Sequence, residues 1–160
     1  MGTKKYRLTG NHINIGNRIL YQIEALKDFG DVKAGDLGGY IESEENLSQY
    51  DNAWVFDNAR VYGNACVFDN ARVYGNACVF GDAQIKSARD YIVFKNWWSS
   101  GRYFTWTRSN NMWKVGCFYG TGEELIKKAY NDSKESGREY ERVVRYVEEI
   151  LEENYGNKED

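Results

Sequence analysis

The sequence of 160 residues contains no proline, a single histidine and only three cysteines. Because proline removes a backbone hydrogen-bond donor, its absence favours a chain rich in hydrogen-bonded strands. An odd number of cysteines excludes a complete disulfide framework. One histidine and scattered cysteines provide no cluster of metal ligands. We therefore expect no metal site, no cofactor and no disulfide scaffold.

Long apolar runs and an excess of positive charge are also missing. No apolar stretch approaches the roughly 18 residues of a membrane span, and the first residues lack the apolar segment of a signal peptide. The 21 basic and 24 acidic residues give a net charge of −3. This charge argues against general binding to duplex nucleic acid, which depends on many phosphate contacts. These absences predict a cytoplasmic protein that does not associate with membranes.

The strongest positive signal is an internal repeat. Residues 58–68 and 70–80 both read NARVYGNACVF, and the finer unit has six residues, Asn-Ala-x-Val-x-(Gly/Asp). Alanine and valine two positions apart point to the same side of a strand. The Gly-Asn and Asp-Asn pairs tolerate left-handed backbone angles and turn the chain. The pattern predicts short parallel strands over residues 52–87, with alanine and valine inside and asparagine at the corners.

This unit resembles the hexapeptide repeat of left-handed β-helices. Together with residues 31–48 it is similar to small repeat proteins of phages and prophages without assigned function. The resemblance implies a mainly β fold with a short left-handed parallel β-helix, located in the cytosol of a bacterial host. The residue patterns that follow the repeats add a C-terminal β-hairpin and a two-helix extension. We expect three parts: an N-terminal strand or cap at 1–31, the β-helix at 32–93, and the hairpin with helices at 94–160.

Five aromatic residues project outward from the predicted β-helix at regular spacing: Phe56, Tyr62, Phe68, Tyr74 and Phe80. A periodic exposed array of this size indicates a contact surface. Two explanations remain open, because the array either packs against the protein's own ends or forms the interface of an oligomer. The family resemblance implies a homotrimer, and cyclic homo-oligomers are common among soluble assemblies.

The flanks follow other patterns. Residues 17–29 alternate apolar and polar positions and predict a strand, with a short helix as the alternative. Residues 103–107 and 112–117 are rich in β-forming residues on either side of a polar turn and predict a hairpin. Two capping boxes then predict the starts of two helices: Thr121-x-x-Glu124 and Ser136-x-x-Glu139.

The segment 94–118 combines eight aromatic residues with four basic residues and no acid. Aromatic faces stack on nucleobases and basic side chains pair with phosphates, so this segment is the candidate site for a nucleotide-like ligand. The alternative is that the aromatics form a core beneath the helices while the bases pair with acidic helix residues. The candidate ligand-binding residues are Arg102, Tyr103, Trp106, Arg108, Trp113 and Lys114.

The resemblance suggests enzymatic activity as one possible function, since many hexapeptide-repeat proteins are acyltransferases with a histidine general base between subunits. Here the single histidine, His12, precedes the repeats, and the predicted β-helix is shorter than in those enzymes. We therefore expect no enzyme and no catalytic residue, and acyltransferase activity is a remote alternative.

The function that these observations favour is a non-catalytic, phage-type binding protein. It would sequester a nucleotide-like ligand or a host defence protein and thereby antagonise host defence. The alternative is a structural protein whose repeats assemble an oligomer and display the C-terminal part.

Overall fold

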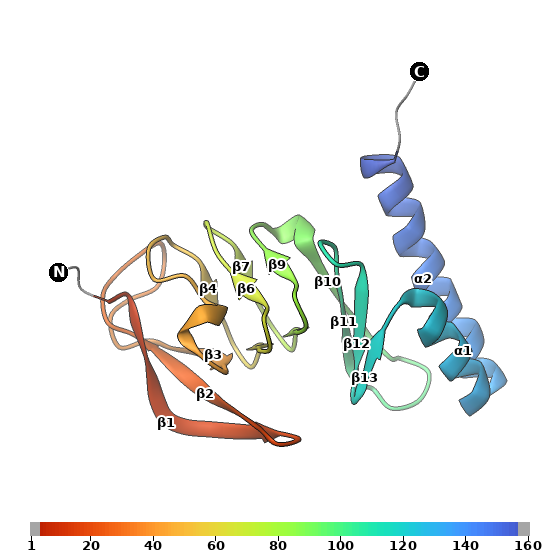
Figure 1. The fold of residues 1–160 in the computed structure, drawn as a ribbon, viewed down its shortest axis with the longest axis horizontal. Helices are drawn as coiled ribbons and strands as arrows, with labels where there is room; N and C mark the ends of the chain where they lie inside the picture. Colours follow the sequence, from red (N-terminus) through yellow and green to blue (C-terminus); the bar gives the residue numbers. More distant parts are fainter. Residues whose placement is uncertain (1–3, 157–160) are drawn as a thin grey trace.

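The structure, a computed structural model, describes residues 4–156 (Figure 1). A long hairpin is followed by the short strands of the repeats, by a four-stranded antiparallel sheet and by two helices. The strands are β1 (Tyr6–Ile15), β2 (Arg18–Ala25), β3 (Leu37–Ile41), β4 (Trp54–Val55), β5 (Arg60–Val61), β6 (Cys66–Val67), β7 (Arg72–Val73), β8 (Cys78–Val79), β9 (Gln84–Ile85), β10 (Tyr91–Lys95), β11 (Tyr103–Thr107), β12 (Met112–Val115) and β13 (Phe118–Gly120). The helices are α1 (Gly122–Asp132) and α2 (Lys134–Tyr155), with 3-10 turns at Glu44–Asn46 and Ala88–Asp90.

The repeats form two-residue strands that pair in parallel with the strand eighteen residues further along the chain. Arg60 lies opposite Cys78, and β4 and β6 pair in the same way with β7 and β9. The alanine and valine ladders are buried along their whole length, each residue at most 2% exposed. The predicted parallel strands of residues 52–87, with alanine and valine inside, are confirmed.

The predicted fold class is nevertheless wrong. The molecule is mainly β with several small sheets, antiparallel and mixed, and two C-terminal helices, and residues 4–156 contain no regular left-handed parallel β-helix. The parallel pairs fall into three different sheets, and the largest, β1-β2-β3-β5-β8, begins with antiparallel strands. The physical reason is that only two residues of each six-residue unit form a strand, and that β1 and β2 before the repeats form an antiparallel hairpin, which adds antiparallel pairs to the sheet.

The N-terminal hairpin extends the sheet of the repeats. β2 confirms the strand predicted at 17–29, and it pairs antiparallel with both β1 and β3. β3 then pairs in parallel with β5, opposing Tyr40 to Arg60. Glycine is required at Gly39, since a Cβ there would lie 2.4 Å from the Ala59 carbonyl oxygen. The tip of the hairpin extends beneath the repeats toward the antiparallel sheet (Figure 1).

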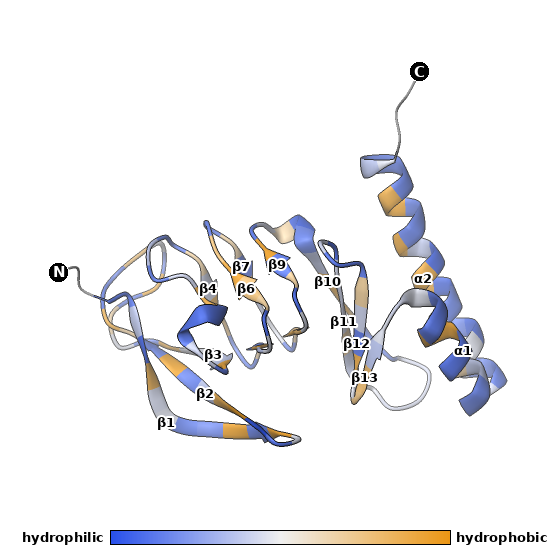
Figure 2. Cartoon of the chain, in the orientation of Figure 1, coloured by the Kyte–Doolittle hydropathy of each residue, from blue (hydrophilic) through white to orange (hydrophobic). Residues whose placement is uncertain are grey.

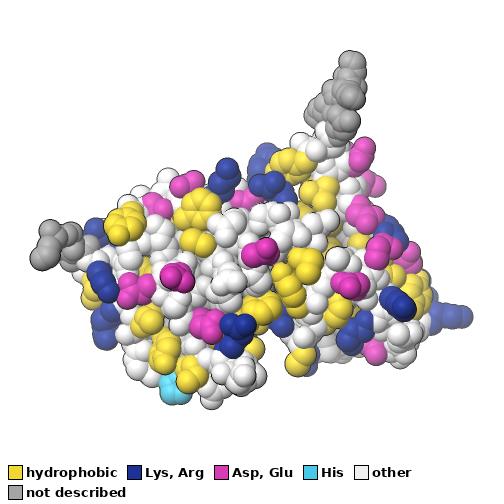
Figure 3. Space-filling view, in the orientation of Figure 1, with side chains coloured by type: hydrophobic (Ala, Val, Ile, Leu, Met, Phe, Trp, Pro, Cys, Tyr) yellow, Lys and Arg dark blue, Asp and Glu magenta, His cyan; other side chains and the backbone are white. Residues whose placement is uncertain are grey.

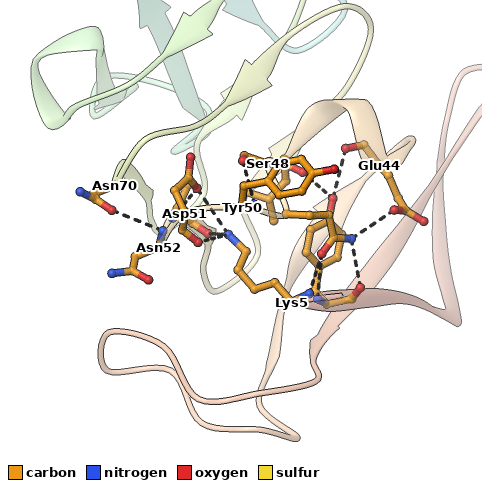
Figure 4. A network of polar contacts seen from close by, with 11 residues as sticks. Lys5, Glu44, Ser48, Tyr50, Asp51, Asn52 and Asn70 are labelled. Atoms are coloured by element: carbon orange, nitrogen blue, oxygen red, sulfur yellow. Dashed lines mark hydrogen bonds and ion pairs between the residues drawn. The ribbon is translucent and has the colours of Figure 1, made fainter. Parts of the chain in front are cut away.

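Lys5 closes the part of the acceptor end of the repeats that β3 does not cover. Its ammonium group is buried at 1% exposure and donates hydrogen bonds to the Asp51 and Ala53 carbonyl oxygens, with the Asp51 carboxylate 3.6 Å away (Figure 4). Next to it, the Tyr6 hydroxyl donates to the Leu47 carbonyl oxygen at 2.6 Å. Side-chain donors therefore satisfy carbonyl groups that no further strand reaches.

Three hydroxyl groups close the donor end of the repeats. The Tyr91, Thr105 and Ser109 hydroxyls accept hydrogen bonds from successive segments of the last repeats. The backbone donors are the N–H groups of Tyr74 at 3.2 Å, Cys78 at 2.9 Å and Gln84 at 2.8 Å. All three hydroxyls belong to the antiparallel sheet or to the turn between β11 and β12. The sheet thus serves as a cap whose side chains replace the backbone acceptors of a further strand.

The C-terminal part is a four-stranded antiparallel sheet, β10-β11-β12-β13, covered by the two helices. The predicted hairpin is present as β11 and β12 at its centre. The capping box at Thr121 and Glu124 is confirmed at the start of α1. The second helix begins earlier than predicted: Ser133 caps α2 by accepting the Ser136 N–H, so Ser136 lies inside the helix.

Two hydrophobic cores meet at β10. Tyr91 and Val93 pack against the core of the repeats, whereas Ile92 and Phe94 pack against the core beneath the helices. This alternation follows from the opposite directions of successive side chains in a strand. In Figure 2 apolar positions follow the repeat strands and one stripe of α2. The two parts of the molecule are therefore joined through a shared strand.

None of the helices within residues 4–156 combines the length and the apolar composition needed to cross a bilayer.

Candidate functional site

A groove lies where three parts of the chain meet. The β1–β2 hairpin tip, the face of the repeats that carries β5 and β8, and the antiparallel sheet enclose about 520 Å³. This volume is within the usual range of roughly 300–1,000 Å³ for small-molecule sites. The outline of the molecule is indented between the hairpin and the antiparallel sheet (Figure 3). The groove is lined by Asn14, Ile15, Asn58, Arg60, Tyr62, Asn76, Cys78, Arg102, Tyr103, Lys114, Gly116 and Cys117.

The charge of the groove is positive. Arg60, Arg102 and Lys114 line it, and no aspartate or glutamate does. None of the three forms an ion pair with a carboxylate of residues 4–156, unlike Arg18 and Arg72, whose guanidinium groups lie 2.8 and 3.0 Å from carboxylate oxygens. Lys114 instead lies over the Phe80 ring, 5.3 Å from its centroid. Three cations without carboxylate partners around one cavity form an electrostatic site for an anion.

The walls of the groove also offer an aromatic surface and amide groups. Tyr103 is 44% exposed, so part of its ring is free to contact a ligand. Asn58 and Asn76 are exposed and occupy equivalent corners of the repeat, next to the paired positions Arg60 and Cys78. Amide groups can donate and accept hydrogen bonds in the same place. The groove therefore combines charge, a stacking surface and polar recognition groups.

Three of the six predicted ligand-binding residues lie together in this groove, namely Arg102, Tyr103 and Lys114. Strand pairing accounts for their common location. Lys114 lies opposite Thr105, which faces the repeats through its bond to the Cys78 N–H. Tyr103 is two positions from Thr105 and so shares its face. This face of the sheet forms one wall of the groove.

Trp106 and Trp113 point to the other face of the sheet. They lie opposite each other in β11 and β12, each is 1% exposed, and both belong to the core beneath the helices. The Trp106 indole N–H donates to the Asn111 side-chain oxygen at 2.8 Å. These rings have no free face on which a base could stack. Trp106 and Trp113 therefore follow the alternative expectation, in which the aromatic residues form a core beneath the helices.

Arg108 is also turned away from the groove. Its guanidinium group binds the buried Asp90 carboxylate, with Nε 3.0 Å from Oδ1, and lies 4.6 Å from the Tyr155 ring centroid. Asp90 also accepts hydrogen bonds from the N–H groups of Lys86 and Ser87. Arg108 is therefore a structural partner of the turn before β10.

The five outward aromatic residues stack mainly on one another. Phe56 stacks on Tyr74 and Tyr62 packs on Phe80, both with ring centroids 4.5 Å apart. Phe80 in turn meets Tyr119 of the antiparallel sheet at 5.0 Å. Tyr62 is 2% exposed and Tyr74 44% exposed. Packing against the protein's own C-terminal part thus covers some of the array, and Phe68 and Tyr74 remain at least partly accessible.

Sequence reasoning missed the contribution of the repeats to the site. Arg60, Asn58, Asn76 and Cys78 stand on the outward positions of the repeat, but nothing in the sequence places them opposite residues 102–117. The absence of acidic residues from 102–117 was the one available signal. His12 is exposed and does not line the groove, and its Nδ1 atom lies 3.2 Å from the Gly10 carbonyl oxygen.

Two of the three cysteines line the groove. The Cys78 thiol contacts the Tyr62 hydroxyl at 3.6 Å, and burial raises the pKa of this thiol. Cys117 is exposed and follows Gly116 in the turn between β12 and β13. The third, Cys66, lies outside the groove, and burial raises its pKa as well. Within residues 4–156 no group of three or more histidine, cysteine, aspartate or glutamate side chains could hold a metal ion.

Comparison with known proteins yields a partial similarity. No protein-family model matches the chain. A protein of Escherichia coli (strain K12) described as "Uncharacterized acetyltransferase YdcK" is 49% identical over 41 residues, which make up 26% of this chain and 13% of that protein. The chain thus matches a small fraction of this curated relative, and the similarity carries no link to phages.

This similarity contradicts the expectation that the chain is not an enzyme. Part of the chain is like a protein described as an acetyltransferase, so the position of His12 and the short repeat region are no ground for excluding catalysis. The expected absence of activity is corrected accordingly.

Proposed function

We propose that this protein binds an anionic small molecule of the nucleotide type in the groove between the repeats and the antiparallel sheet. The observation that carries the proposal is the set of three cations, Arg60, Arg102 and Lys114, that line one cavity without carboxylate partners among the described residues. Phosphate groups are the ligand chemistry that such a set recognises. Phage origin and the bacterial cytosol remain part of this proposal, supported by the sequence resemblance.

Binding follows from the arrangement of the walls. Phosphate oxygens would lie between the guanidinium groups of Arg60 and Arg102 and the ammonium group of Lys114, while a base would stack on Tyr103. Each stacked base contributes roughly 1–3 kcal/mol, and each hydrogen bond to a charged group about 1.5–3 kcal/mol. The asparagine amides supply further hydrogen bonds. A few such contacts reach micromolar affinity when the site needs little ordering.

Calorimetry tests this proposal. The full chain is titrated with cyclic dinucleotides, cyclic trinucleotides, adenosine diphosphate ribose and coenzyme A. Arg102→Gln and Lys114→Gln should each weaken binding about tenfold, since each removes a charge-assisted contact. The matched control Lys127→Gln removes an exposed charge on α1 and should change nothing. The proposal would be rejected if none of these compounds binds, or if the control variant loses as much affinity as the groove variants. Capture of a host protein instead would favour the protein-partner alternative.

A second candidate function is transfer of an acetyl group. The observation that favours it is the partial similarity to the acetyltransferase of Escherichia coli. Acetyl-coenzyme A is itself an anionic nucleotide and has the chemistry that the groove would recognise. Release of free coenzyme A in the presence of amine acceptors, above the rate without protein, would support this function.

A further inference from the structure

The groove contains a nucleophile that the binding proposal does not use. Cys117 is exposed and lines the groove together with the three cations. Reactive cysteines characteristically lie in partly exposed, electropositive surroundings. Cys78 shares the groove, but its burial raises the pKa of its thiol, and it contacts the Tyr62 hydroxyl. Of the two thiols, Cys117 is therefore the one positioned to react.

Arg102 lies directly over the turn that carries this thiol. A Cβ placed on Gly116 would lie 2.6 Å from the Arg102 Nη1 atom, so the guanidinium group packs against the residue next to Cys117. Gly116 has a φ of +55°, a left-handed conformation that also favours glycine. A phosphate held by Arg102 would consequently bring the rest of its ligand close to the thiol.

We propose that Cys117 accepts an acyl group from an anionic thioester bound in the groove, an inference that rests on the proposed nucleotide-type site. The Cys117 thiol gives its proton to water, and its sulfur attacks the thioester carbonyl carbon. A new carbon–sulfur bond forms and the bond to the departing thiolate breaks. That thiolate takes up a proton and leaves as a free thiol. Atoms and charge balance, and no oxidant or reductant is required.

Intact-protein mass spectrometry with acetyl-coenzyme A tests the inference. The full chain should gain one acetyl group on Cys117, located by peptide mapping and removed by neutral hydroxylamine, which cleaves thioesters and leaves acetyl-lysine amides. Cys117→Ser should abolish this modification, and Cys66→Ser, outside the groove, should retain it. Modification of Cys78 or of surface lysines in place of Cys117 would overturn the inference.

A smaller thioester separates positioning from intrinsic reactivity. Arg102→Gln should slow acetylation by acetyl-coenzyme A about tenfold, and should slow acetylation by the acetyl thioester of N-acetylcysteamine, which has no phosphate, by a clearly smaller factor. The ratio of the acetylation rates with the two donors should be larger for the wild-type chain than for free cysteine. Equal ratios would show that the groove contributes nothing to the reaction. Calorimetry on Cys117→Ser with coenzyme A distinguishes the two proposals. If this variant binds coenzyme A but the wild type undergoes no acyl transfer, only the present inference is rejected. If coenzyme A does not bind, the proposed site is rejected as well.

Discussion

At the scale of single residues, Lys5 is the most unusual side chain in the molecule. Burial lowers its pKa from the ordinary value of 10.5 to about 8, while the nearby Asp51 carboxylate opposes this shift. Between these two pH values the unfolded chain holds a proton that the folded chain has released. The contribution of Lys5 to the free energy of unfolding should therefore increase as pH rises through about 8 toward 10.5, whereas the buried Cys66 and Cys78 thiols, whose pKa values burial raises, contribute with the opposite sign above about 9. The neutral amine still has two N–H donors for the Asp51 and Ala53 carbonyl groups.

Lys5→Met should remove this pH dependence and also destabilise the protein at neutral pH. The two carbonyl oxygens would lose their donor, at a cost of roughly 1–3 kcal/mol. Urea unfolding followed by tryptophan fluorescence at several pH values up to the onset of tyrosine ionisation is the measurement. Lys4→Met is the matched control, because Lys4 is exposed and its ion pair with Glu44 lies at the surface. A stability difference between the wild type and Lys5→Met that falls as pH rises in this window would contradict the expected sign.

At the scale of elements, the contact between the repeats and the antiparallel sheet depends on hydroxyl groups. Thr105 is 1% exposed, and its hydroxyl accepts the hydrogen bond of the Cys78 N–H. Thr105→Val keeps the shape of the side chain but leaves that N–H without an acceptor, and should cost about 1–3 kcal/mol of stability. Thr105→Ser retains the hydroxyl and should cost clearly less. Hydrogen exchange of the Cys78 amide gives a local readout, and unchanged protection in Thr105→Val would rule out the cap.

The same strand explains which site residues were predictable. The repeat spacing alone gave the buried alanine and valine ladders, because a period of two within each unit leaves one choice of face. In β11 both faces are covered, one by the repeats and one by the helices, so polarity did not distinguish Tyr103 from Trp106. The alternation of side chains along the strand does distinguish them, since Phe104 and Trp106 share one face and Tyr103 and Thr105 share the other. The opposition of Arg60 to Lys114 across the groove needed the tertiary structure.

At the scale of the whole molecule, a homotrimer stays a prediction. Phe68 and Tyr74 are aromatic residues of the repeat array that stay partly or largely exposed, Tyr74 at 44%. The protein should sediment as a trimer at micromolar concentration, and the double variant Phe68→Ser and Tyr74→Ser should dissociate more readily. Tyr50→Ser is the control, as Tyr50 is 97% exposed and outside the array. A monomeric wild type would contradict the prediction.

The closure of both ends of the repeats has a consequence for how this chain behaves in a crowded cell. Short parallel strands with free backbone groups at either end could template further copies of themselves, and the growth of fibres would follow. Here β3, the Ser48 N–H and the Lys5 ammonium group occupy one end, and three hydroxyl groups from the antiparallel sheet and its β11–β12 turn occupy the other. These capping groups thus prevent end-to-end strand pairing in a chain that has no proline to interrupt it. Loss of the caps would cause the protein to aggregate end to end.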